Sequence, residues 1–133
     1  MQGTRTVQIH ADRTPLLLPG EVISGNVVNG LENRHASGKG RLVVVVEVPE
    51  FGSLKVIGLT SKAMTRTGEK RIELRDNQAW GWGGRSFVWG PTRLSRHDVY
   101  DHVGWVSVSD AETLARRYCL HHNWMANAQK AVA

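Results

Sequence analysis

The chain has 133 residues, 41% of them hydrophobic, an ordinary proportion for one compact globular domain. A single cysteine, Cys119, excludes an internal disulfide, and no stretch approaches the roughly eighteen apolar residues of a membrane span. The residues before Leu16 also lack the pattern of a signal peptide. We therefore expect one cytoplasmic domain over residues 1–133, with residues 1–18 as an N-terminal extension and no membrane partner.

The basic residues concentrate in one part of the chain. The formal net charge is +5, and the stretch from Lys62 to Arg96 holds far more basic than acidic side chains. Its basic members are Lys62, Arg66, Lys70, Arg71, Arg75, Arg85, Arg93 and Arg96, against Glu69, Glu73 and Asp76. This distribution fits a surface for an anionic partner, and it fits a solvated surface that serves solubility equally well.

The first third of the chain predicts one strand and one long loop. After a possible edge strand at residues 6–10, Glu21–Val28 has the apolar content of a strand, and Gly25 within it marks a bulge or a close contact. Asn29–Gly40 is rich in glycine and basic residues, which predicts a loop of the kind that often covers a site.

Two apolar runs in the middle of the chain predict a β-hairpin. Leu42–Val48 is a continuous β-branched run, which indicates a strand buried on both faces, and Pro49 ends it. A turn at residues 51–53 then leads into a second strand, Leu54–Leu59. Because the start of one antiparallel strand faces the finish of the next, we expect Arg41 and Thr60 to lie at the same end of the hairpin.

The remainder predicts three short strands and a helix. The strands are expected at Arg71–Leu74, Arg85–Trp89 and Gly104–Val108. Ser109 and Glu112 fit a capping box ahead of apolar residues at helical spacing, which predicts a helix over residues 109–125. The fold class is therefore mainly β, a small and strongly bent antiparallel sheet or barrel closed by a terminal helix.

The order of several short fragments resembles the MazF/PemK-like toxin family, from Pro19 to Tyr118. In order, these are Gly20–Ile23, the basic loop, Arg41 before its valines, Leu59–Lys62, Ser86–Val88, Gly104–Ser107 and the capped helix. Members often carry an Arg-Pro pair where this chain has Arg41-Leu42. Some also place a carboxylate after the strand that ends here in Trp89-Gly90-Pro91.

The resemblance implies an SH3-like barrel, usually a homodimer, that acts as a metal-independent endoribonuclease. Such proteins cut single-stranded RNA and are neutralised by an acidic antitoxin protein. Arg41 and Thr60 match the catalytic positions of the family. No cofactor and no metal are expected.

The chemistry of RNA cleavage suggests a role for each of these residues. Attack by the 2′-hydroxyl needs a base, stabilisation of a crowded phosphorane, and protonation of the leaving 5′-oxygen. Arg41 suits the second task because its guanidinium donates two parallel hydrogen bonds and stays charged, and the Thr60 hydroxyl can donate a further one. His35 is the candidate general acid or base. The structural alternatives are an Arg41 paired with Glu21 or Glu47, and a Thr60-Ser61 pair that only forms a turn.

Further residues are candidates for gripping single-stranded RNA. Arginines and lysines can hold phosphates while aromatic rings stack on bases, and strand aromatics otherwise fill cores. We expect Trp89 and Trp105 in the core or a dimer interface, and Trp80 and Trp82 exposed among glycines. The candidate RNA-binding set is Ser61, Lys62, Arg34, Lys39, Arg66, Arg85, Trp80 and Trp82.

The histidines give no strong metal signal. His97, Asp98, Asp101 and His102 form a compact group, but their spacing matches no strong zinc signature.

Three classes of function stay open at this stage. The first is the endoribonuclease. The second is a catalytically inactive barrel that binds and inhibits a host protein, as gyrase-poisoning relatives of the fold or a mobile-element growth inhibitor do, because fold alone does not decide function. The third is a non-catalytic RNA-binding module.

Overall fold

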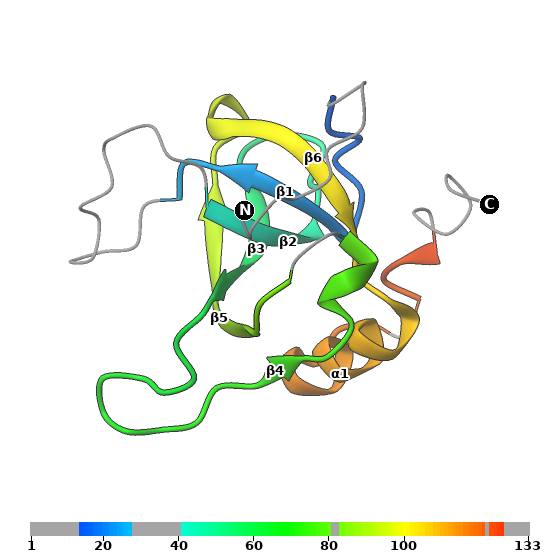
Figure 1. The fold of residues 1–133 in the computed structure, drawn as a ribbon. Helices are drawn as coiled ribbons and strands as arrows, with labels where there is room; N and C mark the ends of the chain where they lie inside the picture. Colours follow the sequence, from blue (N-terminus) through cyan, green and yellow to red (C-terminus); the bar gives the residue numbers. More distant parts are fainter. Residues whose placement is uncertain (1–13, 28–40, 81–82, 122, 127–133) are drawn as a thin grey trace.

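The part of the protein that the structure describes consists mainly of one curled antiparallel sheet and a C-terminal helix (Figure 1). The computed structural model describes residues 14–27, 41–80, 83–121 and 123–126. The sheet has six strands in the order β4-β5-β3-β2-β1-β6 and curls into a half-barrel, so the predicted mainly β fold with a terminal helix is confirmed. The elements are β1 (Glu21–Gly25), β2 (Arg41–Glu47), β3 (Leu54–Thr60), β4 (Glu73–Leu74), η2 (Asn77–Trp80), β5 (Ser86–Leu94), η3 (Arg96–Asp98), β6 (Val99–Trp105) and α1 (Val108–Tyr118).

Apolar side chains cover both faces of the sheet. On the face that we call the helix face, Val44 and Ile57 pack in one cluster with Leu114 of α1. On the opposite face, which we call the second face, Val43 and Val56 belong to a separate cluster. Successive strand residues point to opposite faces, so a strand buried on both sides needs a continuous apolar run. The prediction that the β2 valines are buried on both faces is confirmed.

Strand limits differ from the prediction where neighbouring strands decide them. β4 is shorter than the predicted Arg71–Leu74, while β5 continues past Trp89 to Leu94. The extension of β5 passes through Gly90, whose positive φ of 104° suits glycine, at a register shift against β3. The last strand is Val99–Trp105 rather than Gly104–Val108.

Helix α1 starts and ends earlier than predicted. Its N-cap is Ser107, whose side chain accepts a hydrogen bond from the Asp110 amide, so the predicted capping box of Ser109 and Glu112 is wrong. Asp110 is buried and accepts hydrogen bonds from the amides of Arg75 and Asp76, each at 2.9 Å. These contacts with the segment after β4 hold Asp110 in the first turn of the helix, where its amide donates to Ser107, the N-cap. Cys119, in the left-handed conformation, caps the C-terminus of the helix after Tyr118, short of the predicted end at residue 125.

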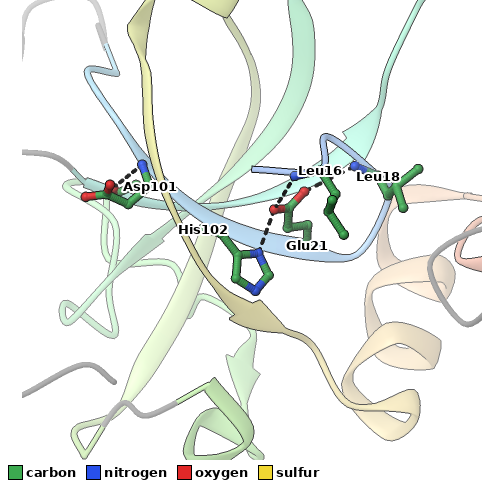
Figure 2. Close-up of polar contacts among 6 residues, drawn as sticks. Leu16, Leu18, Glu21, Asp101 and His102 are labelled. Carbon is green, nitrogen blue, oxygen red and sulfur yellow. Dashed lines mark hydrogen bonds and ion pairs between the residues drawn. The ribbon is translucent and has the colours of Figure 1, made fainter. Parts of the chain in front are cut away.

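A buried carboxylate ties the segment before β1 to β6 (Figure 2). Glu21 is fully buried, and its two oxygens accept hydrogen bonds from the amides of Leu16 at 3.0 Å and Leu18 at 3.2 Å. Nδ1 of His102, on β6, lies 2.7 Å from Oε2 of the same carboxylate. A buried polar group is tolerated when it is hydrogen-bonded, and both oxygens of Glu21 have hydrogen-bond partners.

No helix in the described ranges has the length and apolar content needed to cross a bilayer.

We predict that Glu21→Ala destabilises the protein by about 3 to 5 kcal/mol, because it leaves two amides and the buried His102 ring without their acceptor. Urea denaturation followed by tryptophan fluorescence measures the change. Glu47→Ala, at an exposed position of β2, is the control and should cost less than about 0.5 kcal/mol. A loss below about 1 kcal/mol for Glu21→Ala would contradict the anchoring role.

Candidate functional site

Arg41 and Thr60 lie opposite each other at one end of the sheet. β2 and β3 pair antiparallel with Val43 opposite Gly58 and Val44 opposite Ile57, and the same register, continued by two residues, sets Arg41 opposite Thr60. Directly opposed residues project to the same face with Cβ atoms about 5 Å apart. Arg41 and Thr60 therefore lie at the same end of the hairpin and on the second face, as its antiparallel geometry predicted.

The Arg41 guanidinium carries an uncompensated charge within the described part of the chain. Its side chain is half-buried, and among the described residues it makes no hydrogen bond and no ion pair. Glu21 is engaged by His102 and two amides, and Glu47 is exposed at the far end of β2. The structural alternative, an Arg41 neutralised by either carboxylate, is therefore wrong.

Thr60 combines a turn role with an available donor. Its Oγ1 accepts a hydrogen bond from the amide of Lys62 at 3.2 Å, as expected for a residue that ends a strand. A hydroxyl that accepts through oxygen still has its own hydrogen to donate. Ser61 and Lys62 follow directly and are exposed, so the end of β3 presents a short polar segment.

The site continues along a row of residues on the second face. Thr60 is opposite Phe87 of β5, and Phe87 is opposite Glu73 of β4, so the row runs from Arg41 to Glu73 across four neighbouring strands. Arg85 lies over Phe87, with its guanidinium carbon 5.0 Å from the ring centroid. This predicted RNA-binding arginine therefore lies in the same row as Arg41.

Glu73 holds the Arg85 guanidinium by two hydrogen bonds. Nε of Arg85 donates to Oε2 and Nη2 donates to Oε1, each at 2.9 Å. The hydrogen bond from Arg85 is the main cause that lowers the pKa of Glu73. Burial opposes it, and the positive charges of Arg85 and Arg75 lower the pKa further. Glu73 is thus ionised at neutral pH and is a weak proton acceptor.

Trp80 does not form the exposed stacking surface that we expected. Its side chain is 2% exposed and belongs to the core cluster on the helix face. Turn η2 carries it back onto β6, where a Cβ on Gly104 would overlap it. The glycine-rich neighbours of Trp80 suggested an exposed ring. This expectation is wrong because Trp80 packs on Gly104 of β6, a contact between distant parts of the chain.

Several predicted residues lie outside the described ranges or away from the row. Arg34, His35, Lys39 and Trp82 fall outside the described residues. Arg66 is exposed in the segment between β3 and β4, which extends away from the sheet and is closed by a bridge between Met64 and Lys70 (Figure 1). This segment begins at the Thr60 end of the site, so its lysines and Arg66 extend the basic surface outward.

The sequence did not identify Trp89 as part of the site. Its half-buried indole lies on Gly58, the residue two before Thr60, because a Cβ there would overlap the ring. A glycine inside the apolar run Val56–Leu59 was the available signal, since such a glycine often marks the close approach of another group. Trp89 packs against the core, as predicted, and lies on the second face opposite Gly58, two residues before Thr60.

No group of three or more His, Cys, Asp or Glu side chains in the described ranges gathers where a metal ion could bind. Of the histidine group singled out above, His97 is exposed and His102 turns inward to Glu21.

The chain matches no protein-family model and no curated protein. Among the described residues, the Arg41 guanidinium has no partner, and it shares one end of one sheet face with the Thr60 hydroxyl. These groups can bind a phosphate oxygen pair, since a guanidinium donates in a planar fork and a hydroxyl adds a third donor.

We predict that Arg41→Ala lowers the free energy of unfolding by less than about 1 kcal/mol, because no described partner depends on the guanidinium. Ile57→Ala, a fully buried position on the neighbouring strand, is the comparison and should cost about 2 to 5 kcal/mol. Both values come from urea denaturation. A loss above about 2 kcal/mol for Arg41→Ala would mean that the folded protein neutralises this charge after all.

Proposed function

We propose that this protein is a MazF/PemK-like toxin on an SH3-like barrel, a metal-independent endoribonuclease that cuts single-stranded RNA. The observation that carries the proposal is the Arg41 guanidinium, which has no described partner and lies opposite the Thr60 hydroxyl. A structural arginine that is half-buried is normally paired, whereas a ligand-binding one keeps its donors free until the ligand arrives.

The proposed reaction is cleavage through the 2′-hydroxyl. The 2′-oxygen attacks phosphorus and loses its proton to a base, the bond to the 5′-oxygen breaks, and that oxygen gains a proton. Arg41 would donate two hydrogen bonds to the non-bridging oxygens, whose negative charge grows in the transition state, and Thr60 would donate one more. His35 stays the candidate for proton transfer.

The proposed partners are those of a MazF/PemK-like endoribonuclease. Single-stranded RNA would run along the basic surface that begins at Lys62, where phosphate contacts supply affinity. An acidic antitoxin would neutralise that surface by charge complementarity. We also propose a homodimer.

We predict that the purified full-length protein cuts a mixed-sequence single-stranded RNA in EDTA at selected sites. Arg41→Ala should lower the cleavage rate by about a hundredfold or more, and Thr60→Val by about tenfold, because each removes hydrogen bonds to the phosphorane. Mapping of fragment ends by sequencing reports the sites, and a time course reports the rates.

The matched control is Arg116→Ala, which removes the same charge from an exposed position on α1 and should leave the rate unchanged. RNA that stays intact while the protein still arrests cell growth would favour the inhibitor of a host protein. RNA that is retained without being cut would favour the binding module. Cleavage that is insensitive to Arg41→Ala would reject the assigned site.

A further inference from the structure

Three neighbouring strands present two guanidinium groups on either side of one hydroxyl. Thr60, at the end of β3, is opposite Phe87 of β5, over which Arg85 lies. On its other side, the register of β2 and β3 extended by two residues places Arg41 of β2 opposite Thr60. The two outer strands of this trio are about 10 Å apart at the backbone. The Arg85 guanidinium is held over the Phe87 ring by Glu73 of β4. Thr60 thus has an arginine on each side of it in the row, Arg41 and Arg85.

Arg85 retains donors after its pairing with Glu73. A guanidinium has five N–H groups, and Glu73 accepts from one on Nε and one on Nη2. Among the described residues, no other acceptor binds the two hydrogens of Nη1 or the second hydrogen of Nη2. These hydrogens can therefore be donated to a ligand. The Arg85 side chain is 70% exposed, so a ligand that arrives from solvent can reach these donors.

Three contacts fix the place of this guanidinium although it is exposed. The bidentate pair with Glu73 sets its plane, and the Phe87 ring lies beneath it at 5.0 Å. Just before Arg85, the carbonyl of Gly84 accepts a hydrogen bond from the Asn77 side chain on η2, which anchors the entry to β5. A solvent-facing arginine held this firmly loses less conformational freedom when it binds a ligand.

We propose that Arg85 is a second catalytic guanidinium that contacts the scissile phosphate opposite Arg41, and that Glu73 is the positioning residue that holds it there. This inference rests on the proposed function. Arg85 supplies hydrogen bonds and transfers no proton, so the bond changes stay those of 2′-hydroxyl attack. Two guanidiniums suit a phosphorane, which carries more negative charge than the phosphodiester it forms from.

Kinetics and binding of four full-length variants test the inference. Arg85→Ala should lower kcat by about tenfold to a hundredfold, the effect of losing charged hydrogen bonds. On a non-cleavable 2′-deoxy strand, it should also lower the slope of log affinity against log salt by about 0.7, the value of one phosphate contact. Arg85→Lys should keep the slope and lose the rate, because a lysine lacks the planar fork. Arg116→Ala, on the exposed face of α1, should change neither quantity.

Glu73→Gln separates positioning from a merely structural pair. If Glu73 positions Arg85, this variant binds the 2′-deoxy strand at least as well as the wild type, because a negative charge is gone, while its kcat falls by about tenfold. A structural pair would change the melting temperature and leave kcat unaltered. A rise in kcat would show that Glu73 masks Arg85 and would overturn its positioning role.

The two proposals fail in different ways. If the wild-type protein cuts RNA and Arg85→Ala cuts it at the wild-type rate with an unchanged salt slope, the second guanidinium is rejected while the endoribonuclease stands. If the wild-type protein cuts no RNA, both are rejected.

Discussion

The register between β2 and β3 is the constraint on which the candidate site depends. Val43 lies opposite Gly58, and from this pairing the positions of Arg41 and Thr60 follow. A shift by one residue would turn every side chain of the strand to the other face. On β3 such a shift would turn Ile57 and Leu59 out of the cluster on the helix face, and it would put a larger side chain in place of Gly58, on which the Trp89 ring lies. Apolar packing thereby fixes the place of a polar pair.

The two buried acidic groups of the described residues explain how the ends of this sheet are held. Glu21 binds the amides before β1 and the ring of His102, while Asp110 binds the amides after β4 and forms part of the N-terminus of α1. Each carboxylate satisfies backbone donors that would otherwise be buried without acceptors. Both buried carboxylates therefore have structural hydrogen-bond partners, and neither forms an ion pair with Arg41.

The two arginines on the second face differ in their pairing. Arg41 has no described counter-ion, whereas Arg85 is paired with a carboxylate whose pKa is lowered by that hydrogen bond. An ionised Glu73 is suited to hold a cation and poorly suited to accept a proton. Within the described part of the row, the side chains can therefore bind and polarise a phosphate, and the proton-transfer group of the proposed reaction must come from elsewhere.

Local pattern alone identified the β-hairpin, the burial of its valines and the shared end of Arg41 and Thr60, because apolar runs, a turn and antiparallel geometry are encoded in neighbouring residues. It misplaced the capping serine of α1, the exposure of Trp80 and the reach of β5, and it gave Trp89 no place in the site. Each of these depends on contacts between distant segments, such as Asp110 with Arg75, Trp80 with Gly104 and Trp89 with Gly58. The pairing of Arg85 with Glu73 is of the same kind, since only the alignment of β4 with β5 brings their charges together. A sequence records which groups are present, and the packing of remote strands decides which of them meet.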